Sequence, residues 1–152
     1  MYNFVREKRS GFEITMEEIQ QIEEKYNFKF PAELIDYYLE CNGARVKLCY
    51  FDADYDDEEY DDEEFEYEVR WIVPLKYGEL TFEHIVENCR DYMDNDMFPI
   101  AGNQGGDYYY WNKNNEKVYL YYDDDLDNPV FICHNIKRFF EKLSNSDIEN
   151  KS

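Results

Sequence analysis

The chain has 152 residues, 43% hydrophobic and 19% aromatic, with a formal net charge of −20 at pH 7. This length suits one globular domain that removes about two-thirds of the unfolded chain's surface from water. The excess of acids disfavours direct binding to nucleic acid or to an anionic membrane surface, because such binding depends on Lys and Arg side chains that neutralise phosphates. A basic protein partner agrees with the charge.

The compartment is indicated by the N-terminus and the cysteines. The first ten residues, MYNFVREKRS, lack the apolar run of a signal peptide, and no stretch reaches bilayer-spanning length, so we expect a cytoplasmic protein. None of the cysteines forms a CxxC pair, which favours reduced thiols over a zinc site. The cysteines are Cys41, Cys49, Cys89 and Cys133.

After a lead-in over residues 1–13, the chain predicts a pair of helices. Thr15 and Glu18 have the spacing of a capping box, which starts a helix that ends at Tyr26. Pro31 is expected as the first residue of a second helix, and Asn42-Gly43 as its end, with one of the two in the left-handed conformation. The buried side of the second helix is predicted to consist of Leu34, Ile35, Tyr38 and Leu39.

A strand at Val46, Leu48 and Tyr50 and a partner strand over residues 65–73 are predicted from alternating apolar residues. Between them, residues 52–64 form an acidic hairpin loop, whose adjacent carboxylates repel one another. The loop resembles an EF-hand only in part, because Asp57 occupies the position that requires glycine. We therefore predict no defined metal site and no cofactor.

A middle helix capped by Thr81 precedes the central sheet. Residues 102–106 are glycine-rich but do not match GxGxxG, and no Lys-Ser/Thr follows, so we expect a structural bend there rather than a phosphate site. Asn114-Asn115 suits a tight connection between strands. Two-residue spacing predicts strands with one core-facing side made of Phe98, Ile100, Tyr108, Tyr110, Val118, Leu120 and Tyr122.

The C-terminal part continues with a second acidic turn over residues 123–128 and a short strand over residues 129–133. Asn135 is expected to cap a final helix, and residues 144–152 a flexible tail. The inward side of the final helix is predicted to be Ile136, Phe139, Phe140 and Leu143. The predicted fold is therefore α+β in a single domain: a central, mostly antiparallel sheet packed by an N-terminal helix pair, a middle helix and a C-terminal helix.

In order and spacing, these features resemble the SMI1/KNR4 family of the SUKH superfamily over residues 14–143. The matching segments include Phe30-Pro31-x-x-Leu34, Phe98-Pro-Ile100, Gly105-Gly106-Asp107-Tyr108, Lys117-Val-Tyr119 and Ile136-x-x-Phe139-Phe140. Many bacterial members are immunity proteins that neutralise a cognate secreted toxin, often a nuclease, and fungal relatives are interaction hubs in cell-wall regulation. The resemblance thus implies a binding domain without catalytic residues.

The chemistry in the sequence agrees with a protein that is not an enzyme, because His84 and His134 belong to no nucleophile–base or metal motif. Two alternatives stay open: the acids are only a solvated surface, or the chain is an interaction scaffold without a toxin partner. We expect a monomer that binds a basic toxin domain through its acids. The predicted partner-binding residues are Asp54, Tyr55, Asp56, Asp57, Glu58, Glu59, Tyr60, Asp61, Asp62, Asp123, Asp124 and Asp125.

Overall fold

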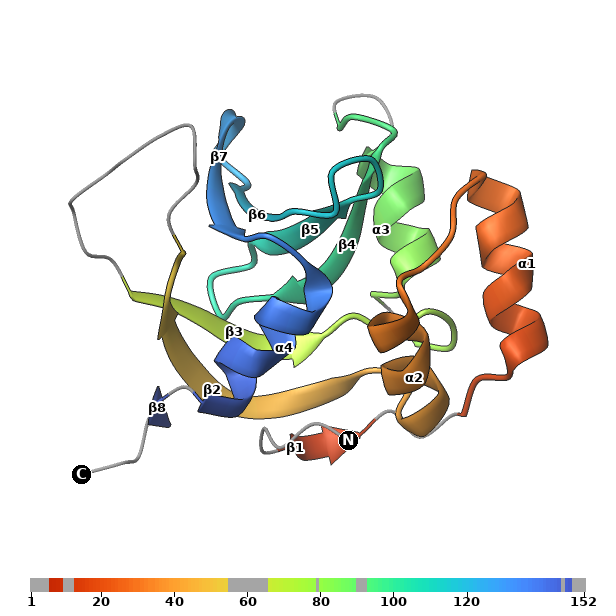
Figure 1. Cartoon of the computed structure of the whole chain (residues 1–152), viewed down its shortest axis with the longest axis horizontal. Helices are drawn as coiled ribbons and strands as arrows, with labels where there is room; N and C mark the ends of the chain where they lie inside the picture. Colours follow the sequence, from red (N-terminus) through yellow and green to blue (C-terminus); the bar gives the residue numbers. More distant parts are fainter. Residues whose placement is uncertain are drawn as a thin grey trace.

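The computed structural model of the chain describes residues 6–9, 13–54, 66–78, 80–89, 93–145 and 147–148. These residues form four helices and an eight-stranded sheet in which every pair of strands is antiparallel (Figure 1). The expected α+β class, with a helix pair before the sheet, a middle helix and a C-terminal helix, is confirmed.

The strands lie side by side in chain order. They are β1 (Arg6–Arg9), β2 (Ala44–Asp52), β3 (Glu66–Ile72), β4 (Met97–Gly102), β5 (Tyr108–Asn112), β6 (Val118–Tyr122) and β7 (Asp125–Cys133). A short strand near the C-terminus, β8 (Asp147–Ile148), pairs with β2. The sheet curves strongly and brings β7 close to the end of β2. There the backbone N–H of Asp54, just after β2, donates to the Ile132 carbonyl of β7 at 2.7 Å.

The helices are α1 (Met16–Tyr26), α2 (Ala32–Glu40), α3 (Phe82–Cys89) and α4 (Ile136–Asn145). Helices α1, α3 and α4 begin where the sequence predicts caps. Thr15 and Glu18 form the capping box of α1, with hydrogen bonds of 3.2 and 3.1 Å. The Thr81 hydroxyl accepts from the His84 N–H at 3.1 Å, and the Asn135 side chain accepts from the Arg138 N–H at 2.8 Å. These caps are local in sequence, which is why they could be predicted.

Two details of α2 differ from the prediction. Pro31 is the N-cap and not the first helical residue, because its ψ of 151° is extended while its carbonyl already accepts the first helical hydrogen bonds. Leu39 is 47% exposed, and Tyr37 is buried instead. Tyr37 continues the stripe of Leu34 at a spacing of three, whereas Leu39 points to another side of the helix. Gly43 has the predicted positive φ, of 87°, but lies beyond the C-cap residue.

One hydrophobic core joins all four helices to the concave face of the sheet. Phe139 of α4 is fully buried and contacts Phe51 of β2 and Tyr109 of β5, with ring centroids 6.1 and 5.4 Å apart. At the other end of the core, Phe28 stacks on Phe98 of β4 at 4.1 Å. Edge-to-face and offset ring packing of this kind adds to the free energy of burial. The predicted inward side of the final helix is confirmed.

The strand prediction for β2 is wrong in its second half. Val46 is fully buried, but the next buried residue whose side chain is described is Phe51, an odd number of positions later, and Tyr50 is partly exposed. The pairing of β2 with β3 shifts register between Arg45 and Cys49. Over this stretch four residues of β2 oppose two of β3, so the ladder is interrupted and the regular alternation of faces does not continue through it. The side chain of Leu48 lies outside the described part.

The β5 side chains also face the other way from the prediction. Tyr109 and Trp111 are buried in the core, whereas Tyr108 is only partly buried at its margin and Tyr110 projects from the other side of the strand. The pairing of Trp111 with the core residue Phe98 of β4 sets this orientation, because residues paired across neighbouring strands project from the same side of the sheet. The predicted core positions in β4 and β6 are confirmed, and they are Phe98, Ile100, Val118, Leu120 and the partly buried Tyr122.

The turns near β5, β6 and β7 have their own corrections. Positive φ occurs at Glu116, with 66°, and not at Asn114 or Asn115. The Asn112 side chain holds this turn by accepting from the two asparagine N–H groups at 2.8 and 3.3 Å. The strand predicted over residues 129–133 is longer, because β7 already begins at Asp125 within the predicted acidic turn.

Candidate partner-binding surface

The predicted acidic residues fall into three groups. Residues 55–62 lie outside the described part of the chain. Asp54 lies beside Ile132, near the end of β7, whereas Asp123–Asp125 lie at the beginning of that strand. An extended strand rises about 3.3 Å per residue, so the two described groups are about 20 Å apart. The structure therefore does not bring Asp54 and Asp123–Asp125 into one cluster.

Asp54 is bound to two cations of α4. Its carboxylate accepts from Arg138 Nε at 3.0 Å and Nη2 at 3.1 Å, and Lys142 Nζ lies 2.8 Å from Oδ1. Lys142 is itself buried. Partial burial of Asp54 opposes ionisation, but the hydrogen bonds from Arg138 and Lys142 outweigh it and lower the pKa of the carboxyl below 3.8. Asp54 thus fixes the chain after β2 to α4, and its charge is compensated within the protein.

Replacing Asp54 with Asn is expected to lower the free energy of unfolding at pH 7 by about 2 kcal/mol, because it leaves the buried Lys142 without its anionic partner. The folded-state pKa lies below the ordinary value of 3.8. The stabilisation is therefore fully present above that pH and is lost as the pH falls through the folded-state pKa. Urea denaturation of both proteins at several pH values measures this difference.

The matched control for this prediction is Asp36→Asn, which removes the same charge from an exposed position on α2. It should change the free energy of unfolding by less than about 0.5 kcal/mol. A difference between the Asp54 variant and wild type that stays constant from pH 7 to pH 3 would contradict the assignment of the ion pair.

The β6–β7 turn carries a tip of exposed carboxylates. Tyr122 pairs with Asp125, so Asp123 and Asp124 form the turn between the two strands. The Asp123 N–H donates to the Asp107 carboxylate at 2.9 Å, which brings a further acid to the tip. Within the described part of the chain, no Lys or Arg side chain forms an ion pair with the carboxylates of residues 123–125. This tip is therefore a source of uncompensated negative charge.

The face of the sheet opposite the core carries a second feature, which the sequence analysis missed. One cross-strand row joins Trp71, Gly102, Tyr108 and Tyr121, and another joins Pro99, Tyr110, Tyr119 and Phe131. Residues paired in this way project from the same side of the sheet. We call these aromatic side chains the outer aromatic face, which consists of Trp71, Tyr108, Tyr110, Tyr119, Tyr121 and Phe131.

The rings of the outer aromatic face contact one another. The centroid distances are 5.7 Å for Trp71–Tyr108, 6.4 Å for Tyr108–Tyr110, 5.3 Å for Tyr110–Tyr121 and 6.0 Å for Tyr119–Phe131. All are partly exposed except Tyr110, which is buried. Large aromatic side chains held in this way lose little conformational entropy when a partner covers them.

Carboxylates lie at two sides of this face. Burial, the neighbouring Tyr119 and the charge of Asp94 raise the pKa of Tyr121. Burial, Cys89 and the charge of Asp123 raise the pKa of Tyr108. Asp94, before β4, lines a cavity together with Tyr110, and Asp123 lies at the acidic tip beside Asp107, the residue next to Tyr108.

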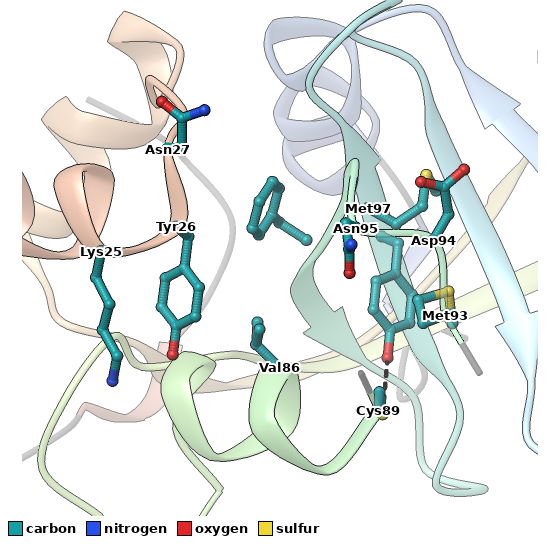
Figure 2. A pocket seen from close by; sticks show the side chains of 11 residues that line it. Lys25, Tyr26, Asn27, Val86, Cys89, Met93, Asp94, Asn95 and Met97 are labelled. Atoms are coloured by element: carbon teal, nitrogen blue, oxygen red, sulfur yellow. Dashed lines mark hydrogen bonds between the residues drawn. The ribbon is translucent and has the colours of Figure 1, made fainter. Parts of the chain in front are cut away.

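A cavity of about 420 Å³ opens beside the outer aromatic face (Figure 2). Lys25 and Tyr26 of α1 line one side, Val86 of α3 lies at its base, and the segment 93–97 lines the other side. Tyr110 belongs both to the cavity wall and to the outer aromatic face, and its hydroxyl is 3.6 Å from the Cys89 Sγ. The cavity wall combines polar and apolar side chains in similar measure.

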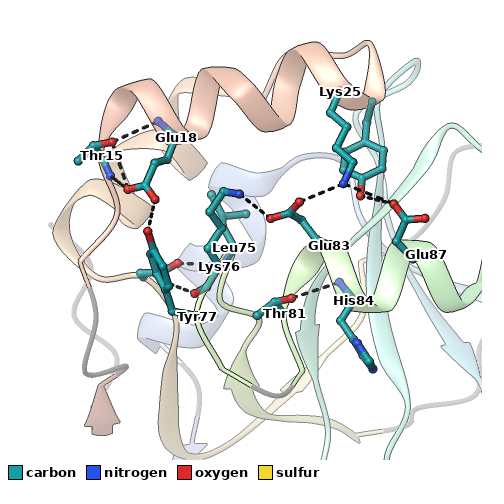
Figure 3. A network of polar contacts seen from close by, with 12 residues as sticks. Thr15, Glu18, Lys25, Leu75, Lys76, Tyr77, Thr81, Glu83, His84 and Glu87 are labelled. Atoms are coloured by element: carbon teal, nitrogen blue, oxygen red, sulfur yellow. Dashed lines mark hydrogen bonds and ion pairs between the residues drawn. The ribbon is translucent and has the colours of Figure 1, made fainter.

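The positive charge at this rim is compensated. Lys25 Nζ lies 3.2 Å from Glu83 and 3.6 Å from Glu87, as Figure 3 shows. Lys76 also pairs with Glu83, at 2.8 Å, and the Tyr26 hydroxyl donates to Glu87 at 2.9 Å. This network connects α1 to α3 and to the loop before α3, so its role is structural.

Neither histidine has a catalytic arrangement among the residues that the structure describes. His84 is exposed, and the hydrogen bond from its backbone caps α3. The ring of His134 packs against Phe131 at 5.0 Å. Over the same residues, no group of three or more His, Cys, Asp or Glu side chains is placed to hold a metal ion.

A signal for the outer aromatic face was present in the sequence. A strand with one face in water alternates apolar and polar residues, but Tyr108–Trp111 and Val118–Tyr122 are aromatic or apolar at every position. In each of these strands, either the odd-numbered or the even-numbered side chains therefore had to face outward. Spacing alone could not say which set, because both have the same period.

Comparison with models of protein families assigns this chain to a family. A search of curated proteins finds no match to this chain. None of the helices in the described part is long and apolar enough to cross a lipid bilayer. The sequence model of the SMI1/KNR4 family (SUKH-1) matches residues 13–142, which agrees with the resemblance over residues 14–143. The chain therefore belongs to the SMI1/KNR4 family (SUKH-1).

Proposed function

We propose that this protein is a non-catalytic, cytoplasmic binding protein, an immunity protein that binds and neutralises a cognate bacterial toxin domain. Family membership supports a binding domain of the immunity type. The observation that carries the proposal is the acidic tip, where Asp123, Asp124 and Asp125 are exposed next to Asp107. A site without compensating cations favours a partner of positive charge.

The proposed partner is a basic toxin domain, and a nuclease suits the charge because its nucleic-acid groove must be basic. Inhibition follows either from occupying that groove or from covering a face beside it. Exposed ion pairs contribute only about 0–1 kcal/mol each, so the acids select the partner's charge and speed association rather than set affinity. Residues 55–62 and the acidic tip together remain the proposed acidic surface.

Neutralising the acidic tip by the triple substitution Asp123→Asn, Asp124→Asn and Asp125→Asn is expected to slow association with the toxin domain by about tenfold at low salt. The difference should shrink as salt screens the charges, while the dissociation rate changes little. Surface plasmon resonance at several salt concentrations measures both rates.

A matched control removes the same charge elsewhere, with Glu17→Gln, Glu24→Gln and Asp36→Asn on exposed positions of α1 and α2. An equal loss of association rate in the control would mean that only net charge matters and would remove the acidic tip from the proposal.

The partner itself is tested by affinity capture of the product of the adjacent gene. A toxin domain that binds and loses its toxicity in the presence of this protein supports the immunity function. Capture of a partner without toxin activity would favour an interaction scaffold and overturn the immunity assignment.

A further inference from the structure

We propose that the outer aromatic face binds arginine side chains of a basic protein partner. The inference rests on the proposed function in taking a basic protein as the partner, and it adds the side chain that is recognised and the place where it binds. The arginine site consists of Asp94, Tyr108, Tyr110, Tyr121 and Asp123.

The aromatic part of the site suits a guanidinium group. Arginine is planar and weakly hydrated, and it stacks on aromatic rings, whereas the lysine ammonium is a compact and strongly hydrated charge. Tyr108 and Tyr121 are partly exposed and lie opposite each other on β5 and β6. The ring of Tyr121 is fixed by its 5.3 Å contact with Tyr110, so the surface is formed before a partner arrives.

The charges select the same ligand. Asp94 lines the same cavity as Tyr110, whose ring contacts Tyr121, and the Asp123 N–H donates to the carboxylate of Asp107, the residue next to Tyr108. Both Asp94 and Asp123 are exposed. An arginine stacked on either tyrosine can therefore pair with a carboxylate at the same time, which joins a cation–π contact to an ion pair. With a net charge of −20, the whole protein attracts a basic surface toward this face.

The protein already binds cations of its own on aromatic rings, which places the arginine site at one end of the face. Lys117 Nζ lies 5.5 Å from the centroid of the Phe131 ring. The Phe131 ring at the β7 end of the face is therefore already covered by a cation of the protein itself. The Tyr108–Tyr121 end has carboxylates instead.

The neighbouring cavity extends the site. Asp94 and Tyr110 line the cavity, and Met97 and Phe98 supply apolar wall. An arginine paired with Asp94 thus has apolar surface within reach for its aliphatic stem, or for the residue next to it in the partner. A flat tyrosine face without this cavity would hold only the guanidinium group.

The experiment uses the full-length protein and two peptides, one of nine arginines and one of nine lysines, titrated by isothermal calorimetry at 150 mM salt. We expect the arginine peptide to bind about tenfold more tightly than the lysine peptide, because the charges are equal and only arginine stacks well. The double substitution Tyr108→Leu and Tyr121→Leu should remove most of that preference and leave the affinity for the lysine peptide unchanged within about twofold.

Control variants separate the site from general effects. Tyr77→Leu removes an exposed tyrosine of the loop before α3 and should leave the preference intact. Tyr108→Phe with Tyr121→Phe keeps the rings and should also leave it intact. Asp94→Asn with Asp123→Asn should reduce binding of the arginine peptide about tenfold, whereas Glu17→Gln with Asp36→Asn should not. These charge variants decide the question if the leucine variant does not fold.

Equal affinity for the two peptides, or an equal loss in the Tyr77 and Tyr108–Tyr121 leucine variants, would overturn the inference. These outcomes are distinct from failure of the proposed function, because the peptides replace the toxin. A toxin domain that binds this protein equally well with and without the tyrosine rings would overturn the arginine site alone. Arginine selectivity in a protein that captures no toxin would overturn the immunity function alone.

Discussion

Replacing Phe139 with Ala is expected to lower the free energy of unfolding by about 4 kcal/mol, the largest effect that we predict for a single residue. Phe139 is fully buried at the centre of α4 and contacts residues of β2 and β5. Its removal takes the ring's burial away and also leaves a cavity, because the curved sheet around α4 is held by its own hydrogen bonds and cannot close over the gap.

Urea denaturation followed by circular dichroism measures this change. Lys137→Ala, on an exposed position of the same helix, is the control and should alter the free energy of unfolding by less than about 0.5 kcal/mol. A loss below about 1.5 kcal/mol for the Phe139 variant would contradict the position of α4 against the sheet.

Replacing Gly102 with Ala is expected to cost about 2 kcal/mol, which is typical of overpacking. Gly102 lies between Trp71 and Tyr108 in one cross-strand row, and a Cβ there would overlap the indole of Trp71. Trp71 is only partly buried, so it can move outward, but it then loses its contact with Tyr108. The variant should therefore show both lower stability and an altered near-ultraviolet tryptophan signal.

Gly105→Ala is the matched control, because the nearest atom to a Cβ at that position is 3.5 Å away and the backbone does not require positive φ. It should leave the stability and the tryptophan signal unchanged. A similar loss at both glycines would mean that the cost does not come from the overlap with the indole, because the lower entropy of the unfolded chain by itself favours the alanine variants.

Features whose cause lies within a few residues were predicted well. The capping box at Thr15 and Glu18 and the caps at Thr81 and Asn135 each use a side chain that bonds to a backbone N–H three residues later. The inward side of α4 follows from helical spacing alone. The family resemblance also depends on such landmarks and on their order, and it is confirmed over almost the same range.

Features that depend on pairing between distant segments were not predicted. The pairing of Trp111 with Phe98 decides that Tyr109, and not Tyr108, is fully buried in the core. The irregular pairing between Arg45 and Cys49 lies where the alternation of β2 changes, and Phe51 is buried beyond it. In an aromatic run such as Tyr108-Tyr109-Tyr110, either the odd-numbered or the even-numbered side chains could face the core, so the residues of the run do not select the orientation.

The candidate site shows the same division. The sequence indicated a basic partner through its charge, and Asp123–Asp125 indeed form an exposed acidic tip. It gave no reason to separate Asp54 from that group, because the pairing of Asp54 with Arg138 joins residues 84 positions apart in the chain. In the tertiary structure, Asp54 pairs with Arg138 and Lys142 and thereby fixes the segment after β2 to α4.

By itself, the sequence determined the fold class, the family and the caps at Thr15, Thr81 and Asn135, because these depend on composition and on local spacing. Only the tertiary structure decided which tyrosines face outward, which acids are already neutralised and where a cavity opens beside them. The physical reason is that strand register and ion pairing are set by contacts between residues far apart in the chain, whose alternatives have nearly equal local preference.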